Sequence, residues 1–212
     1  MHPLVKRIDE LIEQKSLLKH PFYVDWTKGS LPIESIAGYS KEYYQLVKAV
    51  PGLVETVMQY APEDMKEAID SNRKEEQDHI KPWVRFASSL GVPQTELEEY
   101  SALEKTRQAV SYLERLMRSY EEGSAAMYAL ELEIPKVSLS KLDGLRKFYD
   151  LTSDDATEYF RLHTEADIRH AALWRNILEN TTKEGEDDLF DIAQRSVTAQ
   201  HLMLDSCYEA YC

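Results

Sequence analysis

The chain has 212 residues, of which 38 are Asp or Glu and 25 are Lys or Arg, so its formal net charge is −13. This negative charge is spread along the chain and would repel a phosphate backbone or an anionic bilayer, which excludes nucleic acid and membrane surfaces as expected partners. With 43% apolar residues the chain can bury a substantial core. Its length suits one domain that covers residues 1–212.

No apolar run reaches membrane-spanning length, and the residues after Met1 lack the pattern of a cleaved secretory signal. The two cysteines, Cys207 and Cys212, lie so close together that a disulfide between them would close only a very short loop. We therefore expect a soluble, cytoplasmic protein that has no disulfide scaffold.

The predicted elements are helices throughout, because apolar residues recur at steps of three and four, as in Leu4, Ile8, Leu11 and Ile12. No alternating apolar run indicates a strand. Helix-breaking residues divide the chain at His20–Pro21, Gly29–Pro32, Val50–Gly52, Ala61–Pro62, Gly91–Pro93, Glu122–Gly123 and Lys183–Gly185. This pattern predicts a single all-α bundle of about seven to eight helices.

The long helix predicted after Pro62 contains the first candidate for metal binding. Glu75 precedes His79 by four residues and Glu76 precedes it by three, so either carboxylate can share a helix face with the imidazole. Ferritin-like bundles use two Glu-x-x-His elements, and the single copy here favours a different carboxylate–histidine bundle. The same pair is also typical of a solvated helix face.

A further carboxylate, Glu131, lies in the largely apolar segment Ala125–Pro135. A buried acid needs a partner or a metal ion, although a surface position is the alternative. Glu133 lies about 200° further around the same predicted helix, so we do not expect both glutamates to face inward.

The segment Glu158–His170 is the most informative. On one helix His163, Asp167 and His170 fall within about 60° of one another, on a single narrow stripe with apolar neighbours. A carboxylate between two buried imidazoles would be costly to desolvate without a metal ion. Alternatively, the three residues are partly exposed and bridge to nearby arginines or to solvent.

Together these segments supply three imidazoles and three carboxylates. Nitrogen and oxygen donors without sulfur suit iron or manganese, and six ligands can hold two ions with positions left open for dioxygen. The predicted ligands are Glu75 or Glu76, His79, Glu131, His163, Asp167 and His170.

The order of these residues resembles the haem-oxygenase-like di-metal oxidases, whose superfamily also contains thiaminase II and pyrroloquinoline-quinone synthase. The similarity is greatest to the death-domain-associating (CADD) family of self-sacrificing para-aminobenzoate synthases. The active-site cysteine expected of thiaminase II has no counterpart. The resemblance rests on His20–Tyr23, Tyr39, Tyr43–Tyr44, His79–Ala87, Glu131–Pro135, Lys141–Leu145, Tyr149, His163, Asp167 and His170.

This resemblance implies a haem-oxygenase-like fold, a homodimer, and a centre of two iron ions or of one manganese and one iron. It implies that dioxygen and an external reductant convert one of the protein's own tyrosines into para-aminobenzoate for folate synthesis. By the same resemblance Tyr23 is the sacrificed tyrosine, Tyr39 lies beside it, and Lys141 donates the amino group. The implied metal ligands are Glu75, His79, Glu131, His163, Asp167 and His170, with Glu76 as the alternative to Glu75.

Two other functions are compatible with the sequence. A related oxidase would keep the metal centre and oxidise an external small molecule, such as a fatty acid or an amino acid. A non-enzymatic, acidic helical interaction module would instead use the histidine and glutamate stripes only for structure.

Overall fold

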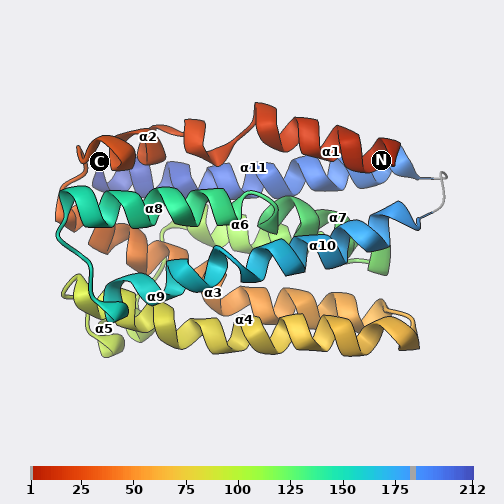
Figure 1. The fold of residues 1–212 in the computed structure, drawn as a ribbon, viewed down its shortest axis with the longest axis horizontal. Coiled ribbons are helices and arrows are strands. Elements are labelled where there is room, and N and C mark those ends of the chain that lie inside the picture. Colours follow the sequence, from red (N-terminus) through yellow and green to blue (C-terminus); the bar gives the residue numbers. More distant parts are fainter. Residues whose placement is uncertain (1, 182–184) are drawn as a thin grey trace.

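The computed structural model describes residues 2–181 and 185–212, and in these ranges every regular element is helical. The helices lie side by side as an elongated bundle (Figure 1). In chain order the elements are α1 (Pro3–Gln14), the 3-10 turn η1 (Leu17–Lys19), α2 (Pro21–Lys28), α3 (Ile33–Tyr60), α4 (Glu63–Ser89), α5 (Gln94–Glu99), α6 (Glu104–Glu114), α7 (Tyr120–Glu131), α8 (Ile134–Phe148), α9 (Asp154–His163), α10 (Ala166–Glu179) and α11 (Glu186–Tyr211).

The all-α prediction is confirmed, while the described residues contain eleven α-helices and not seven to eight. The additional breaks between helices fall at Tyr100–Leu103, Arg115–Ser119, Leu132–Glu133, Tyr149–Ser153 and Thr164–Glu165, where neither Gly nor Pro marks a break. Of the break expected at Lys183–Gly185, Lys183 and Glu184 lie outside the described residues, and Gly185 directly precedes α11.

Two other expected breaks are absent, because α3 continues through Pro51 and α7 continues through Gly123. A proline inside a helix removes one backbone hydrogen bond. Burial of Leu46 and Val47 before it, and of Val54 after it, offsets that loss. In α7, Gly123 allows a close helix approach: a Cβ added there would lie 2.4 Å from Cγ2 of a valine in α3.

Two apolar clusters fill the interior, and the candidate ligands lie where the clusters meet. Along α4, Ile69 belongs to one cluster and Trp83 to the other, with the Glu-x-x-His element between them. Along α9 and α10, Phe160 and Ala171 flank the His, Asp, His stripe in the same way. The fold therefore surrounds a polar layer with apolar packing on both sides.

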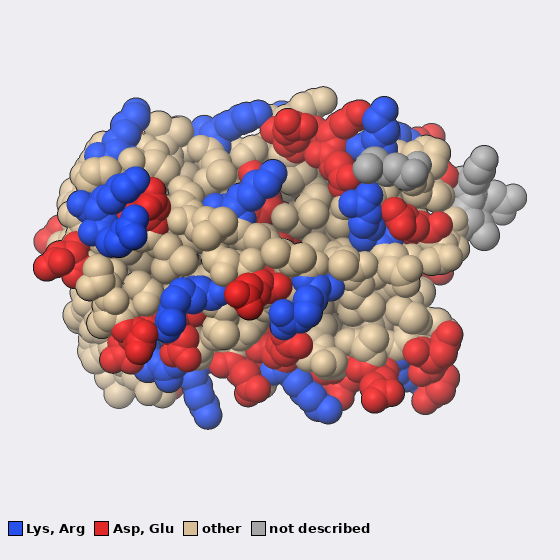
Figure 2. Space-filling view, viewed as in Figure 1, with Lys and Arg blue, Asp and Glu red and all other residues tan. Residues whose placement is uncertain are grey.

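Acidic and basic side chains are interspersed on the face of the molecule that Figure 2 shows. Among the helices of residues 2–181 and 185–212, none has both the length and the apolar character that crossing a membrane requires.

Candidate metal centre

The polar layer is built by α4, α7, α9 and α10. Helix α4 runs antiparallel to α9 and α10 (Figure 1) and packs against both of them. Although α9 ends at His163, the αR backbone of Thr164 nearly continues the helix. His163, Asp167 and His170 therefore stay on one stripe although the helix is interrupted before α10. The residues whose side chains meet in this layer, each buried as a whole residue to at most 6% exposure, are Glu76, His79, Glu131, His163, Asp167 and His170.

One group of potential ligands consists of Glu76, His79 and His163, each of which offers a donor atom within 4.8 Å of the others. Oε2 of Glu76 lies 3.7 Å from Nδ1 of His79 and 4.0 Å from Nε2 of His163. Nδ1 of His163 lies 2.7 Å from the Tyr159 carbonyl oxygen. Since a carbonyl only accepts, Nδ1 carries the proton and Nε2 presents its lone pair to the group.

The second group consists of Glu76, Asp167 and His170. Nδ1 of His170 lies 3.0 Å from Oε1 of Glu76 and 3.6 Å from Oδ1 of Asp167. Glu131 approaches from α7, and Nε1 of Trp174 in α10 donates to its Oε2 at 2.6 Å. The indole fixes this carboxylate and leaves Oε1 without a hydrogen-bond partner.

Glu75, the glutamate implied by the resemblance, lies outside both groups. Its side chain is 36% exposed, whereas that of Glu76 is 8% exposed. Oε2 of Glu75 accepts from Nη2 of Arg169 at 2.6 Å and lies 3.3 Å from Nε2 of His170. Spacing from His79 did not separate the two glutamates. The packing of α10 against α4 distinguishes them, because α10 encloses Glu76 and leaves Glu75 at the rim of the layer.

Glu131 and Glu133 are both buried, contrary to the expectation from a continuous helix. The reason is that α7 ends at Glu131, so Glu133 lies in the turn before α8. Its carboxylate accepts from the backbone N–H of Leu17 at 2.8 Å and from the hydroxyl of Ser16. Glu133 therefore anchors the segment that leads into α2.

The unpaired atoms of the layer fit a metal pair. Buried atoms without a hydrogen-bond partner include one on each of five candidate ligands, and leaving such a group unpaired costs about 1–3 kcal/mol. Mixed carboxylate and imidazole donors that converge in this way suit iron or manganese. These atoms are Glu76 Oε1, His79 Nδ1, Glu131 Oε1, Asp167 Oδ2 and His170 Nδ1.

The pKa values of the carboxylates and imidazoles in this layer depend on one another. Burial acts to raise the pKa of Glu76, but the nearby imidazoles of His170 and His79 outweigh it and lower that pKa. Burial raises the pKa of Glu131 and of Asp167. Burial also acts to lower the pKa of His170, yet the nearby carboxylates of Asp167 and Glu76 raise it to about 11. A metal ion at Nδ1 must therefore displace a proton.

Lys141 of α8 lies in a second buried cluster with Tyr23 and Tyr39. Its Nζ donates to the Tyr39 hydroxyl at 2.6 Å. The same atom lies 4.9–5.2 Å from the ring centroids of Tyr23, Tyr39, Tyr43 and Phe160. Burial lowers the pKa of Lys141 to about 7 and raises that of Tyr23 above its usual value. The three residues predicted for catalysis are thus brought together.

A series of aromatic contacts joins the two clusters. The ring of Tyr159 stacks on that of His163 with centroids 4.0 Å apart and lies 4.6 Å from Trp83. Trp83 lies 5.0 Å from Tyr43, which in turn lies 5.2 Å from Tyr39. Sequence reasoning did not assign a function to Tyr159 or Trp83, because aromatic residues at helical spacing are typical of an ordinary core.

A small chamber adjoins the metal candidates, with Glu76, Glu131, His163 and Asp167 in its wall. Its volume is about 30 Å³, enough for one or two molecules the size of water. The remaining wall is aromatic, from Tyr43 and Tyr159, and aliphatic, from Leu46, Val47, Val50, Leu130 and Ile134.

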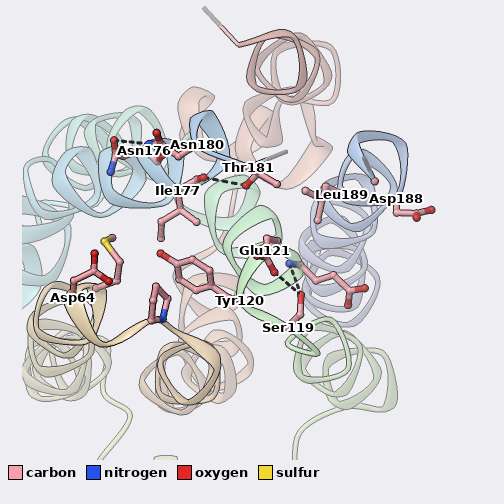
Figure 3. Close-up of a pocket in the computed structure, with 14 residues that line it drawn as sticks. Asp64, Ser119, Tyr120, Glu121, Asn176, Ile177, Asn180, Thr181, Asp188 and Leu189 are labelled. Carbon is pink, nitrogen blue, oxygen red and sulfur yellow. Dashed lines mark hydrogen bonds between the residues drawn. The ribbon is translucent and has the colours of Figure 1, made fainter. Parts of the chain in front are cut away.

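A larger surface pocket of about 650 Å³ lies between the start of α4, the start of α7, the end of α10 and the start of α11. Figure 3 shows acidic side chains around it, including Asp64, Glu121 and Asp188. It contains none of the predicted site residues. The larger pocket therefore does not coincide with the cluster of candidate metal ligands.

Comparison with known proteins shows the family to which the chain belongs. Residues 5–210 match the model of the TENA/THI-4/PQQC family. The chain belongs to this family. It is 30% identical over 221 residues to the 4-aminobenzoate synthase of Chlamydia trachomatis, and the match covers 97% of this chain and 96% of that protein. The pyrroloquinoline-quinone synthase of Pseudomonas aeruginosa is 27% identical over 209 residues, covering 92% and 82%.

The fold of this TENA/THI-4/PQQC family member is also found in solved structures. A domain of unknown function with a haem-oxygenase-like fold from Shewanella denitrificans superposes with a TM-score of 0.77 at 17% identity, covering 98% of this chain and 90% of that one. The resemblance predicted from the sequence is confirmed. The synthases among the relatives also confirm the prediction of an enzyme of this family.

Proposed function

We propose that this protein is a dioxygen-dependent para-aminobenzoate synthase that takes the ring from its own Tyr23 and the amino group from Lys141. The observation that carries the proposal is the buried lysine. Lys141 has aromatic rings around Nζ, and its one hydrogen-bond partner in the described residues is a phenol. A pKa of about 7 leaves much of the amine neutral at physiological pH, with a lone pair available to form a carbon–nitrogen bond.

The two ligand groups support an unequal metal pair. Glu76, His79 and His163 form a two-histidine, one-carboxylate set, which is typical of non-haem iron oxygenases. The other position, with Asp167 and His170 beside Glu76, is richer in oxygen donors and suits manganese or a second iron. When bound, such a pair supplies the electrons that reduce dioxygen, and an external reductant restores them.

The chamber supports a small gaseous substrate and a ring that the protein supplies itself. A fatty acid or an amino acid would not fit in about 30 Å³, whereas dioxygen is close to water in size. The aliphatic wall favours an apolar molecule. An external organic substrate is correspondingly disfavoured.

Tyr23 belongs to the lysine cluster and is absent from the chamber wall. The ring contacts from Tyr39 through Tyr43 and Trp83 to Tyr159 offer a route over which an electron can leave the tyrosine cluster. Burial holds the phenol of Tyr23 protonated, so its oxidation must also release a proton. That proton must leave to an acceptor other than Lys141, because the neutral amine, which lies 5.2 Å from the ring centroid of Tyr23, needs its lone pair to act as the nitrogen donor.

The test is anaerobic reconstitution with ferrous iron, with and without manganese, followed by dioxygen and a reductant. We expect at most one para-aminobenzoate per chain and a matching loss of mass from the protein. Tyr23→Phe and Lys141→Arg should bind the metals and form no product. Tyr60→Phe and Lys147→Arg, which alter exposed residues of the same types, are the matched controls. Product from Tyr23→Phe, or many turnovers on an added substrate, would contradict the proposal.

A further inference from the structure

Asn72 is a buried amide that the function described so far does not use. It is 2% exposed, and neither Oδ1 nor Nδ2 has a hydrogen-bond partner. Burying an amide without partners costs more than burying an apolar side chain of similar size. The position therefore requires an explanation beyond packing.

The helical register places Asn72 beside the metal candidates. It precedes Glu76 by four residues and His79 by seven in the unbroken helix α4, so the three share one stripe. An asparagine does not stand out in the sequence as a metal ligand, because its side chain is uncharged and common in helices without a special role.

The antiparallel packing shows which end of the layer Asn72 extends. His79 faces His163, with ring centroids 4.4 Å apart, and Glu76 faces His170 at 3.0 Å. One turn further toward the start of α4, Asn72 continues past Glu76 on the side of His170, away from His163. Glu131 lies near this same end of the layer, since the charges of His170, Asp167 and Glu76 affect its pKa.

We propose that Oδ1 of Asn72 is a further ligand of the metal position formed by Glu76, Asp167 and His170. This inference rests on the proposed metal-dependent function. An amide oxygen is a hard, neutral donor that suits manganese. It adds a ligand without adding a further negative charge beside the carboxylates of Glu76, Glu131 and Asp167.

The experiment measures anaerobic Mn²⁺ binding by equilibrium dialysis and electron paramagnetic resonance, without turnover. Wild-type protein should bind two ions. Asn72→Leu should bind one of them about 10- to 100-fold more weakly, whereas Asn72→Asp, which retains an oxygen donor at the same place, should bind both. Asn176→Leu, which alters an exposed amide of α10, is the matched control.

Thermal unfolding of the metal-free proteins separates a ligand from a structural residue. Because Asn72→Leu removes two unpaired polar groups, the metal-free variant should be at least as stable as wild type. A destabilised metal-free variant that loses both ions equally would overturn the proposal, as would two ions bound with wild-type affinity. Wild-type protein that binds no metal would instead overturn the proposed function itself.

Discussion

Among single residues, the charged groups of the metal layer are buried with partners of opposite charge, whereas the buried Lys141 has no such partner in the described part of the chain. Glu76 and His170 lie 3.0 Å apart and stabilise each other's charged forms. Lys141 has no carboxylate partner within salt-bridge distance among the described residues, so burial dominates and its pKa falls to about 7. A side chain that is costly to bury in its charged form is kept where its neutral form is useful.

Lys141→Met is expected to flatten the dependence of stability on pH. Between pH 7 and pH 10 the unfolded lysine binds a proton that the folded lysine lacks, so the free energy of unfolding of the wild type rises with pH. The contribution of this group is at most about 1.4 kcal/mol per pH unit. Urea unfolding at several pH values checks this, and equal slopes for wild type and variant would contradict it.

Trp174→Phe is expected to weaken metal binding about 10- to 100-fold, as loss of a partner that orients a ligand does. The variant removes the N–H that fixes Oε2 of Glu131 and retains most of the packing. Trp83→Phe is the matched control, because it removes an equally buried indole donor whose acceptor is the carbonyl of Ser40. Ferrous-iron titration compares the two, and equal affinities would refute the positioning role.

At the scale of helices, the site depends on how closely α3 and α7 approach. Gly123 of α7 lies against Val57 of α3, and the same two helices carry Leu46, Val47 and Leu130 to the chamber wall. A wider separation would enlarge the chamber and move Glu131. The missing side chain of one glycine therefore sets the spacing of a metal ligand and an aliphatic wall.

Gly123→Ala is expected to destabilise the protein by about 1–3 kcal/mol. The added Cβ would lie 2.4 Å from Cγ2 of Val57, a β-branched side chain that has little freedom to move away. A second substitution, Val57→Ala, should recover part of the loss in the double variant. Chemical denaturation of the four proteins measures this coupling, and additive effects would show that the two residues do not clash.

At the scale of the molecule, the proposed ligands come from α4, α7, α9 and α10, so metal binding should couple these helices. An ion at 100 times its dissociation constant stabilises the fold by about 2.7 kcal/mol. In a chain of this size that corresponds to a rise in Tm of roughly 5–10 °C. Scanning calorimetry with ferrous iron or manganese, and then with a chelator, checks the rise and its reversal.

The rise in Tm on metal binding should be larger at higher pH. The pKa of about 11 for His170 means that binding displaces a proton, so metal affinity should rise about tenfold per pH unit. The rise in Tm should be larger at pH 8 than at pH 6. A rise that is independent of pH would mean that His170 is not a ligand.

The homodimer implied by the resemblance stays a prediction, which analytical ultracentrifugation checks.

Features that depend on local spacing follow from the sequence alone. Apolar residues at steps of three and four specify helices, and the same periodicity places His163, Asp167 and His170 on one stripe. Residue types indicated the metal chemistry, because carboxylates and imidazoles without thiolates suit iron or manganese. The family resemblance added Tyr23 and Lys141.

Which side chains meet became clear from the packing of the helices. It enclosed Glu76 and left Glu75 at the rim, although their spacings from His79 are nearly equivalent. It also buried Glu133 through an unmarked helix end, and left the amide of Asn72 without a partner. The physical reason is that each outcome depends on contacts between helices far apart in the chain. Periodicity along one helix defines the face that a residue occupies, whereas packing against other helices defines what that face contacts.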